Sequence, residues 1–173
     1  MVEEIVVKAS EWNRFAIVDT AKRDANSLNR IQLLDLCQCT QTNDELIQEL
    51  APLLPYVHTV SLYGCVQLTD AAVWALAEHC PKLRNLTLTN CPKVTDDAML
   101  RIGEQLTFLE CLDLTHCPLI TAASVRVVVA NNPHLTQLTP GFLRAIPQDE
   151  EVDPSQDLSK QLNARSTDYY TVR

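Results

Sequence analysis

Apolar residues recur at a constant interval of 26 residues along this chain. Three apolar columns stand eight, five and three residues before four evenly spaced cysteines. The cysteines are Cys39, Cys65, Cys91 and Cys117. In the order of these offsets, the columns are Ile31, Val57, Leu83 and Leu109; Leu34, Val60, Leu86 and Leu112; and Leu36, Leu62, Leu88 and Leu114. A fixed period of this length predicts a solenoid, in which one small unit is stacked on copies of itself.

Each unit begins with a pattern that predicts a short strand. In the first unit Leu34 and Leu36 are separated by one residue, and such alternation places both side chains on one buried face. A polar turn follows, and in two units it contains the pairs Thr69-Asp70 and Thr95-Asp96. Thr and Asp side chains accept hydrogen bonds from the free N–H groups of a first helical turn, so they predict a helix start.

The remainder of each unit predicts an amphipathic helix. Apolar residues stand eight, eleven and twelve positions after each cysteine, which places them on one helical face. These residues are Ile47, Leu50 and Ala51; Val73, Leu76 and Ala77; Met99, Ile102 and Gly103; and Val125, Val128 and Val129. Pro55, Pro81 and Pro133 are expected to end three of the helices. Asn43-Asp44 starts the first helix, and the last lacks the Asp, which predicts a looser start.

The repeating motif resembles a known family. Leu-x-x-Leu-x-Leu-x-x-Cys, followed by Leu, Val or Ile and then Thr-Asp, is similar to the cysteine-containing subtype of leucine-rich repeat, over roughly residues 31–140. The resemblance implies a right-handed β/α horseshoe segment of about four 26-residue repeats, with a parallel concave sheet and convex helices. This subtype forms the substrate-binding half of many F-box proteins and the family named as antagonists of the mitotic exit network.

The ends of the chain depart from the repeat. Residues 1–30 are expected to form an N-terminal helical cap; the alternative is a degenerate F-box remnant, because residues 12–16 resemble the last helix of that motif. Leu135 and Leu138 begin a fifth strand. Phe142, Leu143 and Ile146 are expected to cap a repeat domain that spans 31–146. Residues 147–173 begin with an acidic run and are expected to form a flexible tail.

Composition excludes several function classes. The formal net charge of −8 argues against nucleic acid and anionic membranes as partners. A run of about 18 apolar residues, as a membrane-spanning helix requires, is not found, and residues 1–30 do not resemble a targeting segment. We expect a cytoplasmic or nuclear protein, and a mitochondrial location stays open.

Candidate catalytic or metal-binding chemistry is weak. The chain has seven cysteines but no Cys-x-x-Cys pair, so we expect structural thiols rather than metal ligands or disulfides. Its four histidines and three glycines form no catalytic or phosphate-binding motif. We therefore expect a protein without a cofactor and without enzymatic activity.

Strand residues that alternate with the buried leucines predict a protein-binding concave face. The candidate residues are Asp35, Ser61, Tyr63, Asn85, Thr87, Thr89, Asn90, Asp113, Thr115 and His116. Tyr63 is the only aromatic residue among them, and Asp35 and Asp113 favour a partner with a basic surface. The helical outer face and the capped ends are the alternative sites.

Two functions follow from these predictions. The first is a non-catalytic adaptor, acting as a monomer or in a hetero-complex; the resemblance implies substrate recognition linked to ubiquitin ligases. The second is a structural subunit fixed in a large mitochondrial or ciliary assembly.

Overall fold

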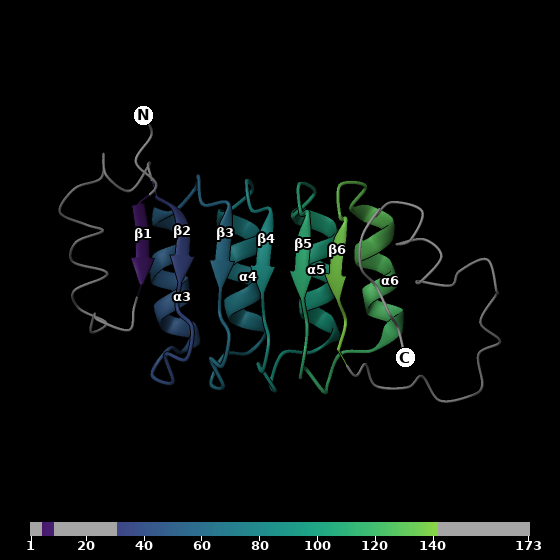
Figure 1. The fold of residues 1–173 in the computed structure, drawn as a ribbon, viewed down its shortest axis with the longest axis horizontal. Coiled ribbons are helices and arrows are strands. Elements are labelled where there is room, and N and C mark those ends of the chain that lie inside the picture. The colour runs from purple at the N-terminus through teal and green to yellow at the C-terminus, as the bar shows by residue number, and fades with distance from the viewer. Residues whose placement is uncertain (1–4, 9–30, 142–173) are drawn as a thin grey trace.

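The computed structural model describes residues 5–8 and 31–141, with side chains for residues 31–141. The described residues form one α/β unit, in which strands of a single parallel sheet alternate with helices (Figure 1). The strands are β1 Ile5–Lys8, β2 Ile31–Asp35, β3 Thr59–Ser61, β4 Asn85–Thr87, β5 Cys111–Asp113 and β6 Gln137–Thr139. The helices are α3 Asp44–Leu50, the 3-10 helix η2 Ala51–Leu53, α4 Asp70–His79, α5 Asp96–Gln105 and α6 Ala122–Asn131.

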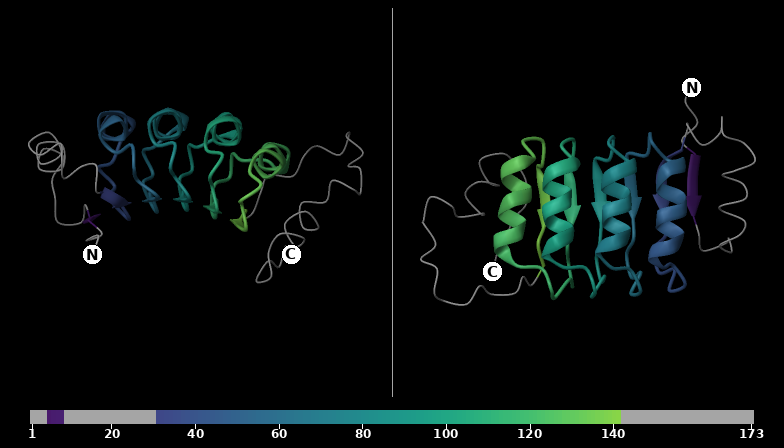
Figure 2. Two further views of the ribbon diagram at one scale, coloured as in Figure 1. Left: turned by 90° about the horizontal axis from the view of Figure 1, so that it is seen from above. Right: turned by 180° about the vertical axis from the view of Figure 1, so that it is seen from behind.

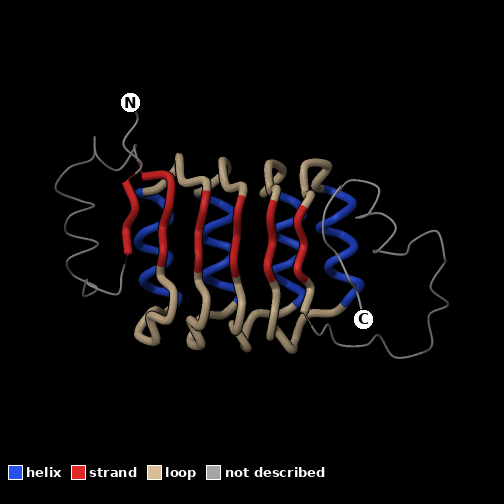
Figure 3. Tube along the Cα trace, in the orientation of Figure 1, coloured by secondary structure: helices blue, strands red, loops and turns tan. Residues whose placement is uncertain are grey.

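The strands lie in the sheet in the order in which they occur in the chain, from β1 to β6. Helices α3 to α6 form a second layer on one face of the sheet, and the opposite face carries no helix from the described residues (Figure 2). Loops at both ends of the strands join the two layers, as the tube in Figure 3 shows. This arrangement is compatible with the predicted solenoid.

The strand register repeats the 26-residue interval of the sequence. Leu34 pairs with Val60, and Leu86 pairs with Leu112. From β3 to β5, each strand has a buried central residue between two half-buried neighbours. The central residues point toward the helices, where they join the predicted helix columns in one continuous core. Stacking therefore buries apolar faces that a single strand and helix leave exposed.

Helix starts agree with the predicted capping residues. The Asn43 side chain accepts a hydrogen bond from the Leu46 N–H, and the side chains of Thr69 and Thr95 cap α4 and α5. Thr121 precedes α6, and its side chain makes no capping hydrogen bond to that helix. The predicted looser start is nevertheless wrong, because Asp96 of the preceding unit accepts hydrogen bonds from the N–H and hydroxyl of Thr121 and from the Ser124 hydroxyl.

All three predicted prolines follow the end of a helical segment, and the first segment differs in its last turn, which ends at Leu53. Helices α4 and α6 each end two residues before a proline, at His79 and Asn131. The first helix was expected to end at Pro55, but α3 ends at Leu50 and continues as the short 3-10 helix η2, which contains Pro52. Proline has no N–H to donate to the preceding turn, so the α-helical hydrogen-bond pattern stops earlier.

The N-terminal side of the sheet differs from the sequence-based expectation. We expected helices to cover the edge of β2, but residues 5–8 form a strand that pairs with it in parallel. The rest of the predicted cap, the candidate F-box remnant, Phe142 with its neighbours and the acidic tail lie outside the described residues. At the other end the predicted fifth strand is present as β6.

Candidate functional site

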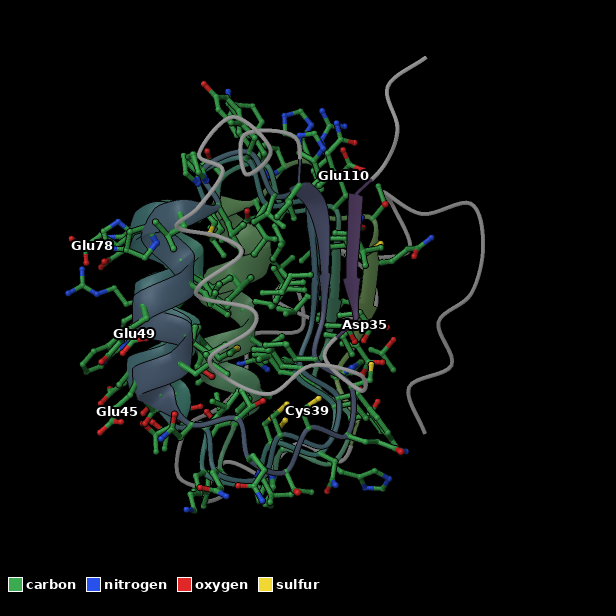
Figure 4. The ribbon with its side chains drawn as sticks, turned by 90° about the vertical axis from the view of Figure 1, so that its left-hand side faces the viewer. Asp35, Cys39, Glu45, Glu49, Glu78 and Glu110 are labelled. Carbon is green, nitrogen blue, oxygen red and sulfur yellow. The ribbon has the colours of Figure 1, made fainter. Side chains whose placement is uncertain are left out.

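The open face of the sheet carries the strand residues predicted to bind protein. Ser61 pairs with Asp35 on one side and with Thr87 on the other, and Thr87 pairs with Asp113. These four side chains therefore form one row across β2 to β5, and all are half-buried. Figure 4 shows Asp35 on the side of the sheet that faces away from the helices. The structure thus brings the predicted residues of this row together.

Tyr63 is more exposed than Thr89 and Thr115, the candidate residues at the equivalent positions of the next two units. It lies just beyond β3, and 39% of its surface is accessible. Its neighbour in the next unit, Thr89, is only 8% exposed, and its hydroxyl oxygen has no hydrogen-bond partner among the described residues. Of these two candidates from the sequence, Tyr63 is therefore accessible to a bound protein, whereas Thr89 is almost fully covered.

Much of the polar chemistry on this face is already used within the sheet. Asp35 accepts a hydrogen bond from the Cys37 N–H at 3.0 Å, and Asp113 accepts one from the Thr115 N–H at 2.9 Å. Asn85 donates to the Thr59 hydroxyl at 3.0 Å. An ionised carboxylate can accept several hydrogen bonds, so these contacts do not use all of the acceptor capacity of Asp35 and Asp113.

The candidate residues Asn90 and His116 lie in the turns that follow β4 and β5. Gln38, Asn90 and His116 all have a φ of 58°, and Gly64 has 73° at the same position of its unit. The backbone N–H groups of Gln38, Gly64 and Asn90 donate to carbonyl oxygens that lie two residues beyond the strand of the next unit, as from Asn90 to Thr115 O at 2.8 Å. The left-handed backbone thus continues the ladder around the turn. Asn90 and His116 have exposed side chains at the edge of the open face.

Three of the four repeated cysteines are buried structural thiols, whereas Cys39 in the first unit is half-buried. The Cys65 Sγ lies 3.2 Å from the Leu36 carbonyl oxygen, and the Cys91 Sγ lies 3.3 Å from that of Leu62. Cys117 makes the same bond to Leu88 at 3.0 Å. Burial raises the pKa of the Cys65 and Cys91 thiols to about 12, so both keep the proton that they donate. Each thiol therefore joins its own unit to the preceding one.

A second ladder of hydrogen bonds escaped the sequence analysis. The Asp70 carboxylate accepts from the Thr95 N–H and the Thr95 hydroxyl, both at 2.7 Å. The same pair of bonds joins Asp44 to Thr69 and Asp96 to Thr121. The 26-residue spacing of Thr-Asp contained the signal, but the Asp was interpreted only as a residue of its own helix start. It instead holds the next helix start in place.

The outer face of the helices carries two exposed apolar residues that the sequence analysis did not consider. Trp74 in α4 and Leu100 in α5 are 42% and 43% exposed. They border a hollow of about 370 Å³, which is also lined by Asp97, Arg101 and Glu104. Comparing the exposed positions at 26-residue spacing would have found them, because Gln48 and Arg126 occupy the same position in the first and last helices.

Side chains in the loops that precede β4, β5 and β6 form a row of contacts on the surface. Lys82 Nζ lies 5.3 Å from the centre of the Phe108 ring, and this ring stacks on His134 with a centroid distance of 6.4 Å. Arg84 and Glu110 form a salt bridge of 2.9 Å beside them. These side chains contact one another across neighbouring units, so we interpret the row as a set of contacts that stabilises the stacking of the loops.

The described residues, 5–8 and 31–141, hold no group of three or more His, Cys, Asp or Glu side chains arranged to bind a metal ion. None of the helices in these residues has the length and apolar character needed to cross a membrane.

Comparisons with known proteins inform the fold. No protein-family model matches the sequence, and no curated protein matches it. Among solved structures, the chain is similar to one in the crystal structure of the Rad7 and Elc1 complex in yeast, with a TM-score of 0.61 and 21% identity. That match covers 72% of this chain and 32% of the other, so this chain spans about a third of it.

Two further structures are similar over most of their length. The actin-binding site 2 of leiomodin-1 has a TM-score of 0.61 at 14% identity, and the match covers 87% of this chain and 88% of that one. The Mex67:Mtr2 subunits from Chaetomium give 0.53 at 20% identity, covering 87% and 99%. Identities this low show a shared fold. The matched chains in the Rad7 and Elc1 structure and in the Mex67:Mtr2 structure come from protein complexes.

Proposed function

We propose that this protein is a non-catalytic scaffold for protein–protein interaction, built from cysteine-containing leucine-rich repeats. The repeat assignment is supported by the thiol bonds from Cys65 and Cys91 to the preceding unit, because they give the motif cysteine a structural role. The cytosol or the nucleus is its proposed compartment.

The observation that carries this proposal is the composition of the open sheet face. Its row of half-buried polar residues is not required by the core, which lies on the other side of the sheet. Tyr63 projects beside this row with 39% of its surface accessible. Tyrosine combines a large contact area with a hydroxyl group and is enriched among residues that dominate binding energy. A protein partner with a basic surface would meet Asp35 and Asp113 at either end of the row.

Within this function, we propose a substrate-recognition adaptor linked to ubiquitin ligases. The resemblance of the repeats to those of F-box proteins supports this role. The similarity to a chain of the Rad7 and Elc1 complex adds a solved example of such a fold inside a protein complex.

A fixed structural subunit is the second candidate. The exposed Trp74 and Leu100 on the helical side favour it, because exposed apolar side chains gathered in one place often mark a protein interface. In that case the helical side, rather than the open sheet face, holds the chain in its assembly.

Affinity purification from the native cells tests the proposal. The tagged chain is compared with a Tyr63→Ala, Asp113→Ala double variant, and the bound proteins are identified by mass spectrometry. We expect a set of partners that the variant loses, including ligase components for the adaptor role. A constant stoichiometric set that the variant retains would support the structural subunit, and the absence of any partner would contradict both roles.

A further inference from the structure

The helical outer face has an apolar centre that stacking of the units does not require. Position 48 and its equivalents at 26-residue spacing are Gln48, Trp74, Leu100 and Arg126. The two ends of this row are polar, and its two middle members are exposed apolar side chains. A solenoid core needs buried columns only, so exposure of Trp74 and Leu100 to water costs free energy without helping the fold.

The two residues lie beside a shallow hollow that is open to solvent. Asp97, Leu100, Arg101 and Glu104 follow one another at helical spacing along α5, and Trp74 faces them from α4. The volume of about 370 Å³ is enough for a large apolar side chain. Arg101 lies 3.8 Å from Glu104, so its charge is directed along α5 rather than toward a ligand.

The lining of the hollow holds two carboxylates and one guanidinium group. Arg101 is the only arginine or lysine in α3, α4 and α5, and Arg126 lies on α6, which packs against α5 on the other side. Figure 4 shows Glu45, Glu49 and Glu78 on the outer side of the helices, away from the sheet. Asp97 and Glu104 are the two carboxylates at the hollow itself. A partner segment with lysine or arginine around an apolar anchor complements this pattern, whereas an acidic segment is repelled.

We propose that the Trp74–Leu100 hollow is a docking site for a basic protein segment that inserts a large apolar side chain between α4 and α5. This inference rests on the proposed scaffold function but assigns binding to the helical face. Apolar contact with Trp74 and Leu100 supplies affinity, and the surrounding carboxylates select a basic sequence around the anchor.

Panning a displayed library of random peptides against the immobilised full chain tests the site. We expect enriched peptides to contain at least one large apolar residue and an excess of Lys and Arg over Asp and Glu. Their affinity should fall about tenfold or more in Trp74→Ala, and it should fall with rising salt concentration. Asp97→Lys, Glu104→Lys should also weaken binding while leaving the apolar residues in place.

Matched variants separate a local effect from unfolding. Gln48→Ala changes the same row on α3 and should leave binding unchanged. Circular dichroism melting of each variant confirms that it folds. In a Trp12→Phe background Trp74 is the only tryptophan, so its fluorescence should shift to shorter wavelength when a selected peptide covers it.

The outcomes distinguish this site from the open sheet face. Peptides that survive Trp74→Ala but are lost in Tyr63→Ala, Asp113→Ala would overturn the docking site and leave the scaffold function intact. Enriched peptides without an excess of basic residues would overturn the proposed partner chemistry. A library that yields no binder, or a Trp74 emission already at short wavelength in the free chain, would show that the hollow is not an available site.

Discussion

Replacing Asp96 by alanine removes the carboxylate that joins α5 to the start of α6. Asp96 accepts hydrogen bonds from the Thr121 N–H at 2.7 Å, from the Thr121 hydroxyl at 2.9 Å and from the Ser124 hydroxyl at 2.5 Å. Asp97 is the matched control, because it lies in the same first turn and carries the same charge. Its carboxylate accepts no hydrogen bond from a described residue, although it borders the outer hollow.

The difference between the two substitutions follows from these contacts. A hydrogen bond to a charged group contributes about 1.5–3 kcal/mol, and three bonds that share one carboxylate are not additive. We expect Asp96→Ala to lower the free energy of unfolding by about 3 kcal/mol. Asp97→Ala loses only a favourable charge at a helix N-terminus, which is worth about 0.3–1 kcal/mol. The expected difference is therefore about 2 kcal/mol.

Urea unfolding followed by far-ultraviolet circular dichroism measures this difference. With a slope of about 1–3 kcal/mol per molar urea, the two midpoints should differ by about 1 M. A double-mutant cycle of Asp96→Ala with Thr121→Val should give a coupling of about 1 kcal/mol or more, because both changes remove the same bonds. Equal midpoints for the two alanine variants, or a coupling near zero, would refute the carboxylate ladder.

Three further predictions concern the core and the thiols. Leu88→Ala should lower the free energy of unfolding by about 2–5 kcal/mol, because Leu88 is fully buried. Thr87→Ala on the opposite face of the strand should leave the free energy of unfolding nearly unchanged. Equal melting shifts for the two variants would mean that the strand faces are reversed. Alkylation of the native chain should modify the half-buried Cys111 before Cys65 and Cys91, as peptide mass mapping will show. The thiols of Cys65 and Cys91 should also make the chain less stable above pH 9. Unfolded thiols lose their protons near pH 9.0, whereas the folded thiols have a pKa of about 12. Their contribution to the free energy of unfolding is therefore complete below pH 9 and is lost as the pH rises toward 12. A urea midpoint that rises over this range, or a slope unchanged by Cys91→Ala, would contradict this.

The buried half of the fold was predictable because the core repeats. Positions such as Leu34, Val60 and Leu86 must fill equivalent places in successive units, so selection for packing keeps them apolar at a fixed interval. The helix starts were predictable for a similar reason, since Asn43 and Thr69 satisfy the same N–H groups in different units.

Strand β1 was missed because its register breaks the interval. Ile5 pairs with Ile31 at the usual spacing of 26 residues, but an irregularity follows, and Val7 pairs with Leu34 at a spacing of 27. A search at constant period loses the column at this point. The carboxylate ladder was missed for a different reason, because a residue type shows which bonds a side chain can make and not which neighbour receives them.

The two candidate surfaces differ in how much of their chemistry the scaffold already uses. On the open sheet face, Asp35 and Asp113 are bonded to nearby backbone N–H groups, so a partner there must compete with existing hydrogen bonds or share their acceptors. On the helical face, Trp74 and Leu100 meet water, and covering them gains about 25 cal/mol per Å² of apolar surface without breaking a bond. Apolar contact depends little on sequence, whereas hydrogen-bond exchange depends strongly on the partner's shape and donors. We therefore expect the helical face to contribute more to affinity and the sheet face to contribute more to partner choice. Because the sheet and helix layers separate the two faces, their effects should be independent of one another.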